Sequence, residues 1–252
     1  MITYTVLGLP TPIRACLFDL DGVLTQTATV HAAAWKEIFD ALLKHEAAQS
    51  DTPYIEFDAV ADYDAYVDGK SRTDGTRSFL QSRSIDLPLG NVADRADAAT
   101  INGLSNAKNA ILVRRIRRDG VHAYPGSVRY LQAARSAGLR TAVVSSSTNC
   151  AEVLAAAGIA DLFETRIDGV TVTTSKLAGK PAPDTYLAAA AELRVPPQEA
   201  AVFEDALSGV QAGRAGGFGF VVGVDRVGQA VALRAAGADI VVSDLAQLLD
   251  AR

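Results

Sequence analysis

Two aspartates, Asp19 and Asp21, stand one residue apart at the end of an apolar run in the stretch CLFDLDGVLTQT. The apolar run is typical of a buried strand. Carboxylates at the end of such a strand repel each other and lose part of their hydration, so a positive charge must compensate them. Aspartate before glycine is also common in turns, and a turn without chemistry is the alternative interpretation. The other strand ends of the sequence distinguish the two.

Polar groups that suit phosphate chemistry end two further predicted strands. VVSSS places Ser145 at one end, VFED places Glu204 and Asp205 at another, and the loop GKPAPD carries Lys180. Four carboxylates close together need a cation, and oxygen ligands with no soft ligand favour Mg²⁺. A carboxylate can accept a phosphoryl group as a nucleophile, whereas a hydroxyl, an ammonium group and the N–H groups after VVS can bind phosphate oxygens. The set predicts metal-assisted phosphoryl transfer.

The elements that must position these groups fall into two kinds. A first strand is predicted over residues 13–19, and HAAAWKEIFDALL places apolar groups at helical spacing over residues 29–43. Short helical patterns follow as far as residue 119, and no strand pattern is convincing between residues 30 and 121. We therefore expect a helical cap domain over residues 28–120, inserted into a catalytic core domain of residues 1–27 and 121–252.

From residue 124 onward, strand and helix patterns alternate. Helices are predicted at 127–138, 149–158, 184–194, 206–217, 227–237 and 245–252, and strands at 139–147, 200–205, 218–225 and 238–244. This alternation predicts an α/β fold with a doubly wound, mostly parallel sheet and helices on both faces. Sites in such sheets lie outside the carboxyl ends of the strands, where the polar residues above are placed.

Composition restricts the class of ligand. The chain has 252 residues, is 49% hydrophobic and has a net charge of -5, so no overall basic field favours nucleic acid or a membrane surface. We expect a small-molecule ligand and, with no signal-peptide pattern or long apolar run, a cytoplasmic protein. The oligomeric state is open, with a monomer favoured. Cys16 and Cys150 lack metal-ligand spacing and are interpreted as buried thiols.

The stretches DLDGV, VVSSS, GKPAPD and FEDALSG resemble, in order and spacing, the four motifs of the haloacid dehalogenase superfamily. The resemblance implies a Rossmann-like core with an inserted α-helical cap. It also implies that Asp19 is the nucleophile that forms an aspartyl-phosphate, and that Asp21 is the general acid/base and gives its carbonyl to Mg²⁺. The remaining residues that it implies are Ser145 and Lys180 for the transferring phosphate, and Glu204 and Asp205 for the metal.

Within the superfamily, the sequence is most similar to the β-phosphoglucomutase family. HAAAWK resembles its cap-helix motif, which implies that His31 orients Asp21 or the substrate and that Trp35 and Thr27 match family positions. GKSRTDG implies that Arg72 binds the phosphate that is not transferred, and NAKNA implies a substrate lysine at Lys108. SSSTN matches a serine-x-serine-x-asparagine pattern and implies further phosphate contacts from Ser146, Ser147 and Asn149.

Three functions remain open at this stage. A mutase interconverting β-glucose 1-phosphate and glucose 6-phosphate needs a closing cap and a second phosphate site, which the helical insertion and Arg72 would supply. A phosphatase acting on a small phosphorylated metabolite would use the same aspartyl-phosphate. A non-enzymatic module binding Mg²⁺ and a phosphoanion is the third possibility. Two structural questions also stay open: whether Ser145–Ser147 cap the next helix, and whether the long segment 45–66 packs or binds a partner.

Overall fold

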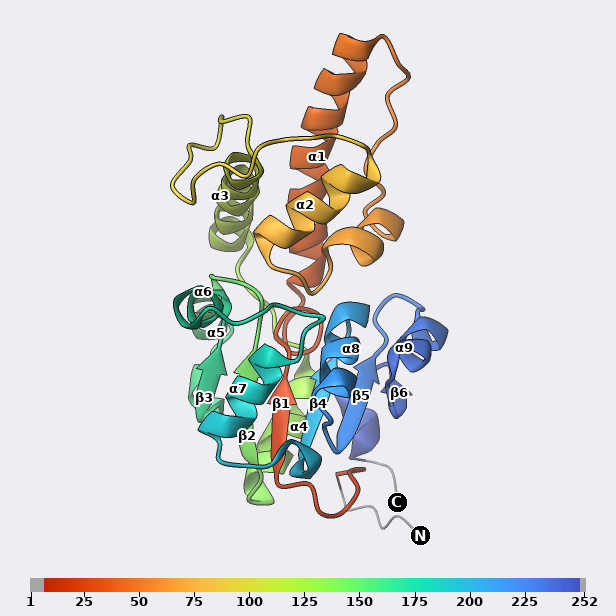
Figure 1. Cartoon of the computed structure of the whole chain (residues 1–252). Helices are drawn as coiled ribbons and strands as arrows, with labels where there is room; N and C mark the ends of the chain where they lie inside the picture. The colour runs from red at the N-terminus through yellow and green to blue at the C-terminus, as the bar shows by residue number, and fades with distance from the viewer. Residues whose placement is uncertain (1–6, 250–252) are drawn as a thin grey trace. The chain divides into compact units, whose positions relative to one another are not determined.

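The computed structural model describes residues 7–249, and the chain divides into two units (Figure 1). The core unit comprises Met1–Gln26 and Val121–Arg252, and the cap unit comprises Thr27–Gly120. The first boundary falls one residue before the predicted one, because Thr27 is the residue that precedes the first helix of the cap unit.

The core unit contains a six-stranded sheet in the order β3-β2-β1-β4-β5-β6, and every neighbouring pair is parallel. The fold predicted from the alternation of strands and helices is therefore confirmed. The three strands with polar ends are neighbours, since β1 lies between β2 and β4. The strands are β1 (Ala15–Phe18), β2 (Arg140–Val144), β3 (Thr165–Ile167), β4 (Ala200–Glu204), β5 (Phe220–Val224) and β6 (Ile240–Val242).

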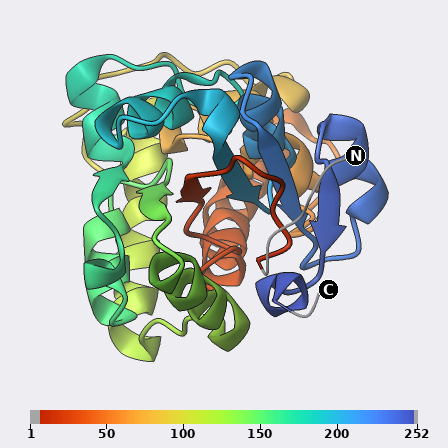
Figure 2. The same ribbon diagram turned by 90° about the horizontal axis from the view of Figure 1, so that it is seen from below.

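Helices cover both faces of the sheet, because alternate strand residues are apolar on both sides. Figure 2 shows α4 (Pro125–Ser136) on one side of β1, and α7 (Asp184–Glu192) and α8 (Leu207–Ala215) on the other. Leu17 belongs to the layer under α7 and α8, and its neighbour Phe18 points to the opposite face. There Phe18 stacks on Phe203 with ring centroids 4.5 Å apart and meets the edge of Tyr130 of α4.

Several core elements differ from the prediction. The first strand is shorter than residues 13–19, because its pairing with both neighbours begins at Ala15. β3 and α6 (Gly169–Ser175) were not predicted: β3 has three residues and buries only Ile167 fully, which is too short for a periodic signal. The predicted last helix is a 3₁₀ turn, Leu245–Leu248, and residues 250–252 of that prediction lie outside the described part. The other core helices are α5 (Cys150–Ala156), α9 (Ala230–Ala236) and the 3₁₀ turns Ala160–Leu162 and Pro197–Glu199.

The cap unit is built from helices α1 (Ala28–Ser50), α2 (Arg72–Ser82) and α3 (Ile101–Asp119), with a π-helical turn at Tyr63–Val67. Helix α1 is longer than the predicted 29–43. Its last turns are exposed and lack an apolar stripe, but the residues are good helix formers without glycine or proline. The helix ends where Asp51 adopts a left-handed conformation with φ of 52°.

Aromatic side chains form the centre of the cap unit. Phe39 of α1 stacks on Trp35 at 4.9 Å and lies 4.0 Å from the ring of Phe79 of α2, measured between centroids. Phe57, from the segment between α1 and α2, is fully buried against both Phe39 and Phe79. The long segment 45–66 therefore contributes to the core of the cap unit.

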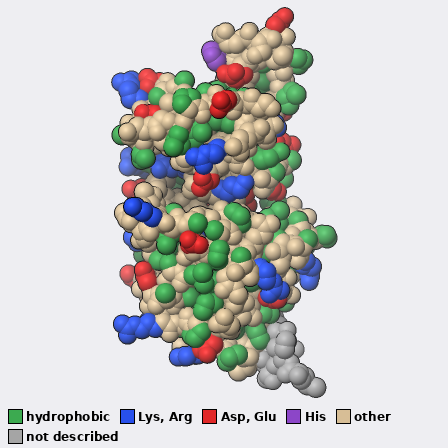
Figure 3. All heavy atoms as spheres, in the orientation of Figure 1, with side chains coloured by type: hydrophobic (Ala, Val, Ile, Leu, Met, Phe, Trp, Pro, Cys, Tyr) green, Lys and Arg blue, Asp and Glu red, His purple; other side chains and the backbone are tan. Residues whose placement is uncertain are grey.

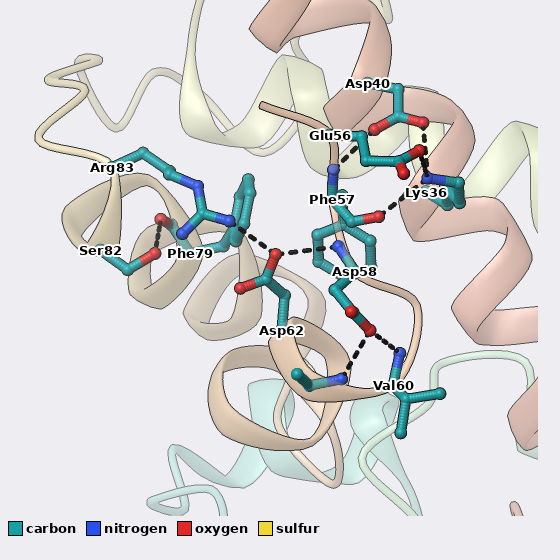
Figure 4. Close-up of polar contacts among 11 residues, drawn as sticks. Lys36, Asp40, Glu56, Phe57, Asp58, Val60, Asp62, Phe79, Ser82 and Arg83 are labelled. Carbon is teal, nitrogen blue, oxygen red and sulfur yellow. Dashed lines mark hydrogen bonds and ion pairs between the residues drawn. The ribbon is translucent and has the colours of Figure 1, made fainter. Parts of the chain in front are cut away.

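Charged groups also attach this segment to the cap helices (Figure 4). Lys36 donates to Glu56 at 2.7 Å and to the carbonyl of Phe57 at 2.9 Å. Asp40 accepts the N–H of Phe57 at 2.8 Å.

Further along the segment, Asp62 accepts a hydrogen bond from Arg83 at 2.6 Å and from the N–H of Asp58 at 2.9 Å. Of the two roles left open for residues 45–66, packing is the one that these contacts support.

Charged side chains of both signs lie on the surface (Figure 3), and the two cysteines are buried. On the face that Figure 3 shows, acidic and basic side chains are interspersed among the described residues. Cys16 and Cys150 are free and buried, as predicted. Among residues 7–249, no helix is both long enough and apolar enough to span a membrane.

Candidate active site

The site is built at the carboxyl ends of three neighbouring strands. Asp19 directly follows β1, Ser145 directly follows β2, and Glu204 is the last residue of β4. Their adjacency follows from the strand order, in which β1 pairs with both β2 and β4. Lys180 comes from the loop that leads into α7.

Lys180 connects these strand ends. Its ammonium group donates to Asp19 Oδ1 at 2.5 Å and to Glu204 Oε1 at 2.6 Å, and it lies 3.4 Å from the carbonyl oxygen of Val144. The side chain of Lys180 is completely buried, as is that of Glu204. A buried ammonium group is stable only with such partners, so the lysine and the two carboxylates depend on one another.

Glu204 is held from several directions. Its Oε1 also accepts the hydroxyl of Tyr186 at 2.9 Å, and its Oε2 accepts the N–H of Ala206 at 3.1 Å. Helix α8 leaves room for this carboxylate because residue 209 is a glycine: a Cβ there would lie 1.7 Å from Glu204 Oε1. The orientation of the carboxylate is therefore fixed by the fold.

Tyr186 is a residue of this site that the sequence analysis missed. It is fully buried, and its ring lies 5.1 Å from the ammonium of Lys180. Burial, followed by the nearby charge of Glu204, raises its pKa well above the usual range, so the hydroxyl remains a donor. The sequence signal that could have found it is the tyrosine among the alanines of DTYLAAAAE. A tyrosine on such an apolar helix is expected to be buried, and a buried hydroxyl needs a hydrogen-bond partner.

Three carboxylates at the site could hold a metal ion. Asp19, Glu204 and Asp205 are buried, and each offers an oxygen within 4.8 Å of the others. The carboxylate of Asp21 is not part of this group, and the contribution of its carbonyl to a metal ion stays a prediction. The turn at Gly22 lies directly against Asp205, because a Cβ on this residue, whose φ is +89°, would lie 1.7 Å from Asp205 Oδ2.

The electrostatics of the group favour a cation. Burial raises the pKa of Asp19 well above its usual range; Lys180 opposes this shift, and Glu204 and Asp21 add to it. Burial alone would lower the pKa of Lys180, but the charges of Asp19 and Glu204 outweigh burial and raise it. Lys180 is hydrogen-bonded to Asp19 and Glu204 but has no such bond to Asp205, and a divalent ion would fit the remaining negative charge and the oxygen ligands of the three carboxylates.

The serine loop after β2 is ordered by its own hydroxyl groups. Ser145 Oγ accepts the N–H of Ser147, and Ser147 Oγ accepts the N–H of Asn149, each at 3.1 Å. Helix α5 begins after Asn149 without a side-chain cap, so the interpretation of the serines as helix caps is wrong. Ser145 is buried and Ser146 is half-buried. The loop therefore presents several hydroxyl and N–H groups beside Asp19.

In the cap unit, the structure brings three of the predicted residues together. Lys108 of α3 is buried, lies 3.1 Å from Nδ1 of His31 and sits 4.8 Å from the ring of Trp35. Because an ammonium group can only donate, the neutral imidazole carries its proton on Nε2. Thr27 lies just before α1, and its carbonyl accepts the N–H of His31. Arg72 is on a different element, as the first residue of α2.

Fold and site together define an α/β protein with an acidic site at the carboxyl end of a parallel sheet and a helical insertion. A family model described as haloacid dehalogenase-like hydrolase matches residues 13–217. The chain belongs to the haloacid dehalogenase superfamily and, within it, to the β-phosphoglucomutase-like family.

Individual relatives cover almost the entire chain. A protein named β-phosphoglucomutase from Mycobacterium bovis is 55% identical over 247 residues, which is 97% of this chain and 94% of the relative. The crystal structure of β-phosphoglucomutase from Clostridium difficile has a TM-score of 0.73 and 27% identity, and covers 94% of this chain and 93% of its own. The crystal structure of a CbbY mutant from Rhodobacter sphaeroides in complex with xylulose 1,5-bisphosphate has a TM-score of 0.68 and 25% identity. The match covers 93% of this chain and 96% of the CbbY chain.

Proposed function

We propose that the protein is a sugar-phosphate mutase that interconverts β-glucose 1-phosphate and glucose 6-phosphate through the 1,6-bisphosphate. The observation that carries the proposal is the 55% identity, over 97% of the chain, to a protein named β-phosphoglucomutase. The geometry of the site is compatible with it, because Asp19 lies beside a buried lysine and among the carboxylates of the acidic group.

The proposed reaction begins at Asp19. Its carboxylate attacks the phosphorus atom of the sugar bisphosphate, and the bond between phosphorus and the sugar oxygen breaks. The electron pair stays on the sugar oxygen, which takes a proton from Asp21. The resulting aspartyl-phosphate then transfers its phosphoryl group to the other hydroxyl of a sugar monophosphate, and Asp21 removes the proton of that hydroxyl.

Other residues of the core unit bind the group in transfer. Lys180, the hydroxyl group of Ser145 and the backbone N–H of Ser146 contact the oxygens of the transferring phosphoryl group, whereas the N–H of Ser145 is donated to the carbonyl of Ile167. Asp19, Glu204, Asp205 and the carbonyl of Asp21 would hold Mg²⁺. When bound, that ion neutralises charge on the phosphoryl oxygens and on the crowded carboxylates.

The second phosphate needs its own donors. We assign it to Arg72, Ser147 and Asn149, which carry over from the family pattern. Lys108 is assigned to the substrate, and His31 to the orientation of Asp21 or the substrate. Thr27 and Trp35 are assigned to the support of this set, since Trp35 lies under Lys108 and the carbonyl of Thr27 accepts from His31. The bisphosphate in the CbbY complex belongs to that relative, and it supports a two-phosphate ligand for this family member. A cytoplasmic location and a monomer stay predictions of the sequence.

The alternative is a phosphatase that uses the same aspartyl-phosphate, which the hydrolase family model would also fit. An assay with Mg²⁺ and β-glucose 1-phosphate, with and without glucose 1,6-bisphosphate, separates the two. We expect glucose 6-phosphate to form, the bisphosphate to accelerate it, and little inorganic phosphate to appear. Phosphate release that the bisphosphate does not change would establish the phosphatase instead.

Arg72→Ala provides an independent test. Because a mutase must bind two phosphates at once, we expect KM for the sugar phosphate to rise about tenfold to a hundredfold, by analogy with other charged pairs. Hydrolysis of a small ester with a single phosphate should change little. Arg77→Ala is a suitable control, since Arg77 lies on the same helix and forms an exposed ion pair with Asp74. Equal effects of Arg72→Ala on both substrates would argue against a second phosphate site.

A further inference from the structure

The turn that carries Asp21 is held by an arginine outside the four motifs and outside the residues that the family model matches. Arg226 follows β5, and its Nε donates to the carbonyl of Gly22 at 2.9 Å. Another guanidinium nitrogen lies 3.3 Å from the carbonyl of Val23, which also accepts the hydroxyl of Ser127 at 2.6 Å. We propose that Arg226 is a positioning residue for Asp21.

The guanidinium group is itself held rigidly. It donates to the carbonyl of Ser243 at 2.7 Å and lies 3.7 Å from the centre of the Tyr124 ring. Its side chain is only 14% exposed. Several fixed donors on one planar group define the position of two successive carbonyls more tightly than a lysine does, because the three donors of an ammonium rotate at the end of a flexible stem.

These contacts act on Asp21 through the backbone. The N–H of Gly22 donates to the carbonyl of Thr25 at 2.8 Å, and this N–H belongs to the same planar unit as the carbonyl of Asp21. Arg226 fixes the next peptide unit through the Gly22 carbonyl. With the units on both sides of Gly22 fixed, the backbone that directs the Asp21 carbonyl and side chain is also fixed.

The same loop contacts the acidic group from a second side. The side-chain amide of Gln229 donates to the carbonyl of Asp205 at 3.0 Å. Asp225 orders the loop by accepting the N–H groups of Gly228 and Gln229 at 2.7 and 2.8 Å. Residues 225–229 thus support both the Asp21 turn and the Asp205 loop, which meet at Gly22.

The inference rests on the proposed role of Asp21 as general acid, and the leaving group provides a specific readout. A sugar oxygen needs a proton as it leaves, whereas p-nitrophenolate leaves without one. If Arg226 positions Asp21, its loss should slow the reaction of sugar phosphates and spare the first phosphorylation of Asp19 by p-nitrophenyl phosphate. A purely structural role would slow both alike.

The experiment compares Arg226→Lys, Asp21→Asn and the parent protein, all with Mg²⁺. It measures glucose 6-phosphate formation from β-glucose 1-phosphate in the presence of glucose 1,6-bisphosphate. In a separate reaction without sugar phosphates, it measures the rate of the first-turnover burst of p-nitrophenolate. For Arg226→Lys we expect glucose 6-phosphate formation to fall about tenfold and the burst rate to change less than about threefold. Asp21→Asn should likewise slow glucose 6-phosphate formation and spare the burst rate, with a larger loss of glucose 6-phosphate formation.

Arg140→Lys is the matched control, because Arg140 also donates to a backbone carbonyl, that of Leu193, but lies at the end of β2 opposite to Ser145. Both of its rates should be unchanged. Ser127→Ala removes the other side-chain donor to the carbonyl of Val23. It should also slow glucose 6-phosphate formation more than the burst, by a smaller factor than Arg226→Lys, and it replaces Arg226→Lys as the test if that variant does not fold. An equal loss of both rates, or no loss, in the Arg226 variant would overturn the inference. The absence of a split in Asp21→Asn would instead overturn the proposed role of Asp21.

Discussion

The two units of the protein each contain a cluster of charged side chains, and the clusters differ in how completely their charges are compensated. In the cap unit, burial would raise the pKa of Asp40, but the N–H of Phe57 and the ammonium of Lys36 outweigh burial and lower it. In the core unit, burial and the neighbouring carboxylates raise the pKa of Asp19 despite Lys180. The negative charge of Asp40 in the cap cluster is thus compensated by its neighbours. The core cluster, which contains Asp19, Glu204, Asp205 and Lys180, is suited to a further positive charge.

This difference distinguishes a structural from a functional cluster. Buried charges that serve only stability are normally paired and hydrogen-bonded. A group whose charged form is disfavoured by its surroundings, at the edge of a sheet where sites form, is a candidate for chemistry. Equivalent substitutions in the two clusters should therefore have different effects.

The largest contrast is expected between Asp19→Asn and Asp40→Asn. Asp19→Asn removes the proposed nucleophile, and phosphoryl transfer should fall at least about a thousandfold with the fold intact. Asp40→Asn weakens the attachment of the Phe57 segment and should cost about 1–2 kcal/mol of unfolding free energy with little effect on turnover. Turnover assays and denaturant unfolding measure the two effects. Comparable activity losses in both variants would show that the clusters do not differ in role.

Metal addition should sharpen the contrast. Mg²⁺ should stabilise the protein by about 2.7 kcal/mol at a free concentration about a hundred times its dissociation constant, because the acidic group exists only in the folded state. Asp205→Asn should remove most of this stabilisation. Asp62→Asn in the cap unit should lower the stability without Mg²⁺ and leave the increment due to Mg²⁺ unchanged. Thermal unfolding with and without the ion measures both, and an increment retained in Asp205→Asn would contradict the assignment.

The smallest effect concerns the support of Glu204. Tyr186→Phe removes the hydroxyl bound to Glu204, and we expect Mg²⁺ binding, measured by calorimetry, to weaken about tenfold, as is usual for partners of metal ligands. Tyr130→Phe is the matched control, because the hydroxyl of Tyr130 is also buried but donates to a backbone carbonyl, that of Leu7. The Tyr130→Phe variant should lose about as much unfolding free energy as Tyr186→Phe and keep its affinity for Mg²⁺. Unchanged affinity in Tyr186→Phe would make that hydroxyl a packing feature only.

The sequence was most informative where several local signals agreed. The apolar strands ending in FDLD, VVSSS and VFED were predictable, and the rule that parallel strands share one carboxyl edge placed Asp19, Ser145 and Glu204 together. β3 was missed because three residues carry no periodicity. The end of α1 was misplaced because its exposed last turns have helix formers but no apolar stripe.

Residues that act through others were not predictable. Tyr186 and Arg226 lie far from their partners in sequence, and their types occur throughout ordinary cores and loops. Only the path of the chain shows that the hydroxyl of Tyr186 meets Glu204 and that the guanidinium of Arg226 meets the turn after Asp21. Long-range hydrogen bonds of this kind leave no local pattern.

The most direct measurement is the identification of the phosphorylated residue. The protein would be mixed with Mg²⁺ and glucose 1,6-bisphosphate, quenched, reduced with borohydride and digested for mass spectrometry. Borohydride converts an acyl phosphate into an alcohol, so we predict that residue 19 is recovered as homoserine and that Asp21, Glu204 and Asp205 are unchanged. Recovery of unmodified Asp19 during turnover, or modification of another carboxylate, would contradict the account.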